Sequence, residues 1–306
     1  MIPTERTFEL LKLLQLPGVG PARARDALAA ASGGRLIDLA VDKLKITPEL
    51  LDRSEKEAVE IVRGCAELNV KIIGRGDSGY PPRLAEISDW PPIIFVKGDE
   101  QALLRTCIAV VGTRQASEAG ARIAKTISAF LAARDIVVVS GLAIGIDSAA
   151  HEGALAAHGQ TVAVLAHGLD TVSPARNKDL ARRLLDHGGA LISEHPPGFP
   201  ARPPEFVRRN RLQSGLSLGS VIVESDVVGG AMHQATFTRR QRRRLFVVLA
   251  STDDARRTLN EAGARHLIQT LEATPISSTK ELAVELSRAE ADVETPRSEG
   301  QRRFEW

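Results

Sequence analysis

The sequence contains few cysteines, and they form no recognisable motif. Cys65 and Cys107 are the two cysteines among 306 residues, and no Cys-x-x-Cys pair or Cys/His cluster accompanies them. This pattern argues against a disulfide and against a zinc site. We therefore expect a protein of the reducing cytoplasm that binds no metal and needs no cofactor.

Long apolar runs and targeting signals are also missing. The N-terminus lacks the basic and then apolar segments of a signal peptide, and no apolar stretch reaches the ~18 residues that a membrane-spanning helix requires. We expect a soluble protein without a membrane partner. Its 43% hydrophobic and 25% charged residues are typical of globular proteins, and its length predicts about two domains.

Three widespread enzyme motifs are either missing or stand in the wrong context. The chain has no Gly-x-x-x-x-Gly-Lys-Ser/Thr; Gly74–Gly79 fits Gly-x-Gly-x-x-Gly but leads into Tyr80-Pro81-Pro82 instead of a helix, and Gly215–Gly219 fits Gly-x-Ser-x-Gly but precedes a predicted strand instead of following one. The sequence therefore argues against a Rossmann dinucleotide site, a P-loop NTPase and a serine hydrolase. We expect a protein that is not an enzyme and has no catalytic residues.

Positive charge is concentrated in one part of the chain, although the formal net charge is only +2. Residues 201–260 hold 11 arginines, no lysine and 5 acidic residues, a local excess of +6. A polyanion would respond to this local excess of positive charge more than to the net charge of the whole chain. The distribution therefore favours a nucleic acid as partner.

Composition divides the chain into four segments. Residues 1–69 predict a small helical domain, in which Pro17–Pro21 joins two helices as in a helix-hairpin-helix; a plain helix–helix corner is the alternative. Residues 70–107, with four prolines, predict an extended connector packed on the core. Residues 108–286 predict an α/β domain, and the charged residues 287–306 predict a disordered tail.

Short Val, Ile and Leu runs separated by helix-length spacers fill the third segment. Such runs predict a mostly parallel, doubly wound sheet, in which ligands bind beyond the carboxyl ends of the strands. The predicted strands are residues 108–111, 136–139, 161–165, 190–192, 220–223 and 245–249. The residues that follow these strands are the candidates for a binding site.

The turn after the first strand has the residues of a phosphate site. Gly112 permits close approach of a ligand, Thr113 and Ser117 offer hydroxyl groups, and Arg114 can bind a phosphate through two hydrogen bonds. Ser117 also fits the N-cap of the next helix, and we expect both roles.

The turn after the second strand, Ser140–His151, is the most informative stretch. Gly141 and Gly145 lead from the strand to an Ala-rich helix, so backbone N–H groups can face a phosphate. Asp147 and His151 would share one face of that helix. They suit an acid/base pair or half of a metal site, but no third ligand or nucleophile is in view. We expect Asp147 to cap the N-terminus of this helix and His151 to form a hydrogen bond with Asp147. Both residues would then organise the pocket.

The most basic short run follows the fourth strand. It holds Arg208, Arg209, Asn210 and Arg211. Three guanidinium groups so close together suit several phosphates along a strand better than one small anion, and a solvated helix face is the alternative. The fifth strand is followed by Glu224, Gly229 and Gly230. We expect these three residues to help shape the same pocket.

Taken together, these segments resemble the DprA/Smf family of DNA-processing proteins. The matching motifs, in order, are Val111–Gly120, Ser140–Leu155, Gly168–Asp170, Ser193–Gly198, Phe206–Arg211 and Gly215–Ser217. Six motifs in the same order make the resemblance specific, and it spans residues 10–271. The sequence departs from the family pattern at Ser173, where a Tyr is usual, and at Gly229–His233.

The resemblance implies an extended Rossmann-like domain behind a small helical domain of the SAM type. It further implies that the basic pocket binds single-stranded DNA, that the protein dimerises, and that it helps to load RecA recombinase during DNA uptake. The residues that match the family's ligands are Gly112, Arg114, Ser117, Gly141, Gly145, Arg209, Asn210 and Arg211.

Two other functions stay open at this point. One is a nucleotide-processing enzyme of the phosphoribohydrolase type, in which Asp147, His151 and Glu224 would be the chemical groups, although that family's Pro-Gly-Gly-x-Gly-Thr signature is missing. The other is a DNA- or nucleotide-sensing module of a defence or mobile-element system. The sequence does not separate such a module from a transformation protein.

Overall fold

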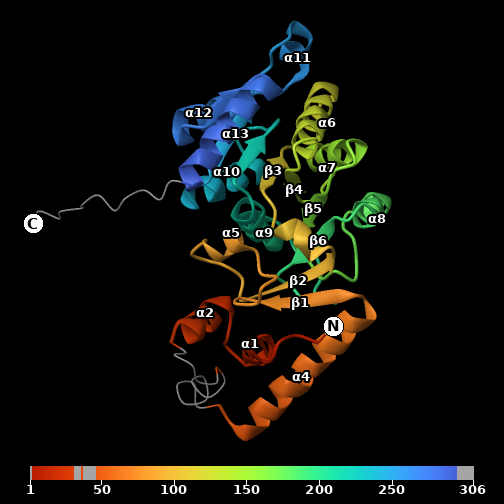
Figure 1. Ribbon diagram of the computed structural model, residues 1–306, viewed down its shortest axis with the longest axis vertical. Coiled ribbons are helices and arrows are strands. Elements are labelled where there is room, and N and C mark those ends of the chain that lie inside the picture. The colour runs from red at the N-terminus through yellow and green to blue at the C-terminus, as the bar shows by residue number, and fades with distance from the viewer. Residues whose placement is uncertain (1, 31–35, 37–45, 295–306) are drawn as a thin grey trace, which may run out of the picture.

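Nine strands form one sheet in the computed structural model, which describes residues 2–30, 36 and 46–294 (Figure 1). The strands are β1 Val70–Gly74, β2 Ile93–Gly98, β3 Cys107–Val111, β4 Val137–Ser140, β5 Thr161–Val164, β6 Ala190–Ser193, β7 Gly219–Ile222, β8 Arg244–Val248 and β9 Thr274–Ile276. Their order is β1-β2-β6-β5-β4-β3-β7-β8-β9. Every pair from β6 to β9 is parallel, and β1–β2 and β2–β6 are antiparallel. The predicted doubly wound, mostly parallel sheet is confirmed.

Helices cover both faces of the sheet because alternate strand residues are apolar on each side. On β4, Val138 packs with the helices of one face, whereas Val137 and Val139 pack with those of the other. The first face carries α6 Glu118–Ala132, α7 Ile146–Ala156, α8 Lys178–Asp186, α11 Asp253–Thr258 and α13 Thr279–Glu294. The second carries α5 Pro82–Ala85, α9 Pro203–Leu216, α10 Gly230–Arg240 and α12 Ala262–Leu271.

The N-terminal helices lie at one end of the molecule, beside β1 (Figure 1). They are α1 Glu5–Gln15, α2 Pro21–Ala30 and α4 Pro48–Glu67. The predicted turn between the first two helices is present, with Gly18 at φ +75° and Val19 buried against Leu13 and Leu16. Residues 31–35 and 37–45 of the predicted helical domain lie outside the described residues.

The predicted connector over residues 70–107 is instead part of the sheet. Strands β1 and β2 pair with each other, and β2 also pairs with β6, so the segment extends the sheet by two antiparallel strands. The prolines that suggested a connector lie between the two strands, around α5 and up to Pro92. The strands form because Ile93–Val96 is buried on both faces. The short helix η1 Glu100–Leu103 then leads to β3.

The prediction of disorder from residue 287 is wrong for residues 287–294, which continue helix α13. This helix holds because Leu282, Leu286 and Ala289 lie on one face, where they are buried against the core beneath α6 and β8. Residues 295–306 of the predicted tail lie outside the described residues. None of the helices that the structure describes is long and apolar enough to cross a membrane.

Replacing Leu282 by Ala tests whether α13 is part of the fold. Leu282 has no exposed surface, and truncating such a side chain leaves a cavity that costs about 3 kcal/mol. We expect the free energy of unfolding, measured with urea, to fall by that amount. Val284→Ala on the same helix is the control, because Val284 is 52% exposed and its truncation should have little effect. Equal stability of the two variants would mean that α13 does not contribute to the core.

Candidate functional site

A cleft of about 570 Å³ opens at the carboxyl ends of β3 and β7, between the turn after β3, the start of α7, helix α9 and the loop before α10. The predicted residues that line it are Gly112, Thr113, Arg114, Asp147, Arg209, Asn210, Gly229 and Gly230. Those that lie outside its lining are Ser117, Gly141, Gly145, His151, Arg208, Arg211 and Glu224. The position is the one that a doubly wound sheet predicts for a ligand.

Close backbone contact between two turns forms one wall of the cleft. The Ile146 N–H, at the start of α7, donates to the Thr113 carbonyl oxygen at 3.1 Å. A side chain on Gly145, which has φ +84°, would overlap the carbonyls of Thr113 and Arg114. Glycine at position 145 therefore allows the two backbone segments to pack closely together, although Gly145 itself does not line the cleft.

Arg209 forms the charged floor of the cleft. Its side chain projects from α9, it is 6% exposed, and Nη1 donates to the Gly141 carbonyl at 2.9 Å and to the carbonyl of Val164. Any side chain on Gly141 would overlap this guanidinium group. Burial lowers the pKa of Arg209 to about 10, against the attraction of Asp147, so the group remains charged at neutral pH.

Asp147 is placed opposite this cation. Its Oδ2 accepts the Gly141 N–H at 3.1 Å, and the side chain is 7% exposed. Burial raises the pKa of Asp147, although Arg209 and the amide of Gly141 favour the charged form. The carboxyl group therefore fixes the turn after β4 beneath Arg209. The prediction that Asp147 caps the helix is wrong, because Gly145 is the N-cap of α7 and no side chain caps this helix.

The rim of the cleft carries an exposed guanidinium group above an aromatic ring. Arg114 lies over Phe206, with 5.5 Å between Cζ and the ring centroid. Nearby, Arg202 at the N-cap of α9 lies 5.3 Å from the ring centroid of Phe199. Phe206 lines the cleft, and its position beside the arginine run was the signal for it in the sequence. Both guanidinium groups are accessible to an anion.

Ser117 is the N-cap of α6, and a carboxylate from the chain itself occupies this helix end. Its Oγ accepts the Gly120 N–H at 2.9 Å. Oε2 of Glu224 accepts both the Ser117 N–H, at 2.9 Å, and the hydroxyl, at 3.1 Å, while Oε1 accepts the Asn260 N–H. Glu224 is 4% exposed, so a buried anion meets the positive end of the helix where the sequence suggests a phosphate.

The arginine run does not present one surface, because successive residues of an α-helix differ by about 100°. Arg209 points into the cleft floor, Arg208 is exposed and pairs with Glu205 at 3.5 Å, and Arg211 is buried against Glu194 and Asp89. Asn210 lines the cleft and donates from Nδ2 to the Gly230 carbonyl at 3.1 Å, which joins α9 to the start of α10.

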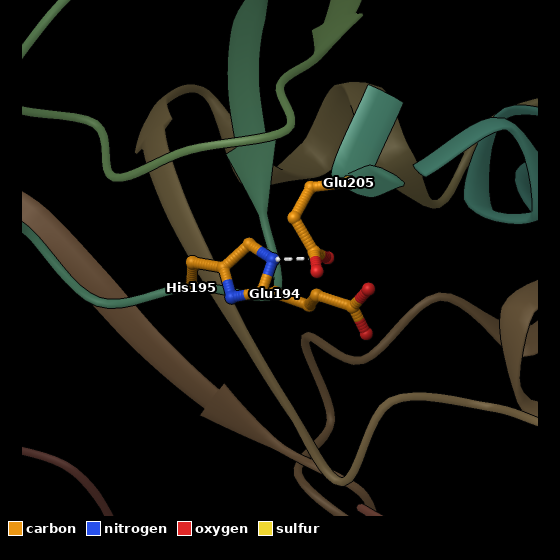
Figure 2. A group of neighbouring side chains, drawn as sticks. All are labelled: Glu194, His195 and Glu205. Carbon is orange, nitrogen blue, oxygen red and sulfur yellow. Dashed lines mark hydrogen bonds and ion pairs between the residues drawn. The ribbon is translucent and has the colours of Figure 1, made fainter. Parts of the chain in front are cut away.

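Glu194 and His195, which follow β6, gather with Glu205 at the N-terminal end of α9 (Figure 2). His195 Nε2 lies 3.1 Å from Glu205 Oε2, and the three residues could present ligand atoms to one cation. Glu194, however, already pairs with Arg211, and Glu205 pairs with Arg208. Burial lowers the pKa of His195, in opposition to the two carboxylates. The cluster therefore holds α9 in place through its own ion pairs.

The predicted hydrogen bond between Asp147 and His151 does not form. His151 is fully buried, and Nδ1 lies 2.7 Å from Oγ1 of Thr161, whose own proton is donated to the Val138 carbonyl. Nδ1 is therefore the protonated nitrogen. Burial, with a smaller contribution from Arg209, lowers the pKa of His151 to about 3. The imidazole is neutral and acts as a core side chain between α7 and β5.

Three polar cleft residues carry no signal in the sequence. They are Gln213 on α9, Ser225 after β7 and Gln234 on α10. Each belongs to a stretch that reads as ordinary helix or turn. Gln213 and Gln234 become part of the cleft through the packing of α9 on α10. Their neighbours on these helices give no pattern from which the cleft could be predicted.

The chain is similar to proteins of one family. The model of DNA recombination-mediator protein A matches residues 71–287. Protein Smf of Escherichia coli is 41% identical over 180 residues, which are 59% of this chain and 48% of that protein. DNA processing protein DprA of Streptococcus pneumoniae is 37% identical over 196 residues, which are 63% of this chain and 66% of that protein.

A solved structure shares the fold over nearly the whole chain. DNA processing protein A from Streptococcus pneumoniae superposes with a TM-score of 0.75 and 29% identity, covering 91% of this chain and 97% of that one. By sequence, the match spans about half of the length of the Escherichia coli relative and just under two thirds of the pneumococcal one.

Acid should destabilise the protein through His151. Between its ordinary pKa of 6.5 and its folded value of about 3, the unfolded chain binds a proton that the native state does not, so stability falls as pH falls. From pH 6.5 to 5 the loss is about 2 kcal/mol, at about 1.4 kcal/mol per pH unit. We expect His151→Gln to remove this part of the pH dependence in urea titrations.

His187→Gln is the matched control, because His187 is exposed at the end of α8. His195 contributes to the acid sensitivity in the same direction, so each variant is compared with the unmodified protein. An unchanged slope between pH 7 and pH 5 in His151→Gln would contradict the neutral, buried imidazole.

Proposed function

Because the chain belongs to the DNA recombination-mediator protein A family, we propose that it binds single-stranded DNA in the cleft beyond β3 and β7 without catalysing a reaction on it. The observation that carries this proposal is the pair of exposed Arg114 and half-buried Phe206 at the rim, above the buried cation of Arg209. A guanidinium group beside an aromatic ring offers a phosphate contact and a base-stacking platform together.

The predicted binding residues divide into two groups under this proposal. Those that contact the strand are Gly112, Thr113, Arg114, Arg209, Asn210, Gly229 and Gly230, which line the cleft. Those that shape it are Ser117, Gly141, Gly145, Asp147, His151, Arg211 and Glu224, which are held by contacts within the fold. Arg208 is exposed beside the cleft and offers a further contact to the phosphate backbone.

The arrangement of the candidate chemical groups supports a protein that is not an enzyme. Asp147 lines the cleft, whereas His151 is bonded to Thr161 and Glu224 caps α6. These three residues would have to meet at one substrate in a phosphoribohydrolase-like mechanism, and the structure separates them. We retain the enzyme as the alternative that release of free base from a nucleoside monophosphate would support.

We further propose that the protein protects incoming single strands in the cytoplasm, helps to load RecA recombinase on them and acts as a homodimer. The support for RecA is membership of a family of DNA recombination mediators.

Replacing Arg114 by Ala tests the proposed cleft. Loss of one charged phosphate contact should weaken binding of a labelled oligothymidylate about tenfold and make the slope of log K against log salt shallower by about 0.7. Fluorescence anisotropy across a range of salt concentrations measures both quantities.

Arg134→Ala is the control for this measurement. Arg134 is an exposed arginine that also lies over a ring, Phe130, at the far end of α6. We expect its removal to leave affinity and salt slope unchanged. If both variants bind as the unmodified protein does, the strand does not bind in the cleft.

A further inference from the structure

An arginine-rich turn lies at the edge of the sheet opposite to the cleft. Helix α10 ends at Arg240 and β8 begins at Arg244. Five of the six residues from 239 to 244 are arginine, and we call this segment the arginine turn. Because β3, β7 and β8 are parallel, the first residue of β8 lies at the amino edge of the sheet, whereas the cleft opens at its carboxyl edge. The arginine turn is therefore separate from the cleft.

The arginine turn presents positive charge that the fold does not neutralise. Arg243 is held against α5 by an ion pair with Glu86 at 2.8 Å. Arg240 and Arg242 are instead exposed, and neither forms an ion pair with a residue that the structure describes. An exposed guanidinium group without an acidic partner can bind a phosphate through two hydrogen bonds. The turn therefore offers two such groups to an anion in solution.

The backbone of the turn has a conformation that favours glycine over arginine. The N–H of Arg243 donates to the Thr238 carbonyl at 2.9 Å. The N–H of Arg242 donates to the Arg239 carbonyl at 3.0 Å. These are the two hydrogen bonds of a Schellman motif, in which the residue after the C-cap is left-handed and is usually glycine. Arg242 takes this position with φ +56°, at a cost in stability that glycine would avoid. The helix dipole favours cations in the last turn of α10 but does not explain an arginine here.

The surroundings of the arginine turn favour one kind of anion. Among the described residues, none of its guanidinium groups lies over an aromatic ring, in contrast with Arg114 and Arg202 at the cleft. Single strands are held in large part by stacking on such rings, whereas a duplex keeps its bases inside and offers its phosphates. The exposed large hydrophobic side chains of the described residues also lie elsewhere, although a protein partner would need an apolar centre.

We propose that the arginine turn binds the phosphate backbone of a nucleic-acid duplex, through the guanidinium groups of Arg240 and Arg242. The contact is electrostatic and reads no base sequence. It rests on the charge and geometry of the turn and does not require a strand in the cleft. Together with the proposed function, it lets one protein molecule hold a single strand at one edge of the sheet and a duplex at the other.

A variant that carries both Arg240→Gln and Arg242→Gly tests this proposal. The probes are a labelled duplex of about 20 base pairs and a labelled oligothymidylate of about six nucleotides, each titrated by fluorescence anisotropy over a range of salt concentrations. We expect duplex binding to weaken about tenfold at low salt. The slope of log K against log salt should become shallower by about 1.8, because two phosphate contacts are lost. Binding of the oligothymidylate should not change.

Two other variants and one melting curve complete the test. Arg114→Ala should show the opposite pattern, with weaker binding of the oligothymidylate and unchanged binding of the duplex. The matched control combines Arg53→Gln with Arg63→Gln, which removes the same charge from two exposed arginines of α4 and should leave both affinities unchanged. The change to glycine at position 242 relieves a left-handed arginine, so the melting temperature of the turn variant should not fall, and weaker binding is then not a sign of misfolding.

The outcomes separate the two proposals. The duplex site is overturned if the unmodified protein does not bind the duplex, or if the turn variant binds it as tightly. It is also overturned if Arg114→Ala weakens duplex binding as much as the turn variant does, because the duplex then lies in the cleft. Polyglutamate that displaces the duplex as well as unlabelled duplex does would assign the turn to an acidic protein instead. Failure of the unmodified protein to bind the oligothymidylate counts against the proposed function alone.

Discussion

A buried guanidinium group ties helix α9 to the carboxyl ends of two strands. Nη1 of Arg209 bonds the carbonyl that follows β4 and the last carbonyl of β5, and the turn after β4 is in turn held by Asp147 from α7. Strand ends, α7 and α9 therefore share one charged contact. Burial of a cation is tolerated only where carbonyls and a carboxylate compensate it, so these elements have little freedom to move apart. The cleft takes its floor from this constraint.

A second buried charge, of opposite sign, fixes the other wall. Glu224 follows β7 and closes the N-terminus of α6, which it reaches through the backbone and hydroxyl of Ser117. The carboxylate also requires that residue 120 be glycine, because a side chain there would overlap it. The N-terminus of α6 could bind an external anion, but the carboxylate of Glu224 already occupies it. In the proposed binding mode, the phosphate contacts lie instead at the rim, at the turn that begins with Gly112.

The sequence predicts the parts of this site that depend on strand ends and backbone conformation. The run of apolar strands and Gly112 predict a cleft at these strand ends, where the structure has one, whereas Gly141 and Gly145 are needed for close packing beside it. The direction of the side chains on α9 could not be predicted in the same way. Successive residues of an α-helix point about 100° apart, so a shift of one residue moves an arginine from the cleft to the core. The antiparallel pairing of β1 with β2 and the burial of α13 likewise depend on distant partners.

The excess of arginine in residues 201–260 overstates the charge that a polyanion meets. Arg211 is neutralised by Glu194, Arg243 pairs with Glu86 at 2.8 Å, and Arg239 pairs with Glu272 at 3.3 Å. Few exposed guanidinium groups therefore remain near the cleft. Two of them, those of Arg114 and Arg202, lie over phenylalanine rings. With few phosphates neutralised, the salt-dependent part of binding is limited. In the proposed binding mode, stacking of bases on the two phenylalanine rings then supplies more of the binding free energy than charge does.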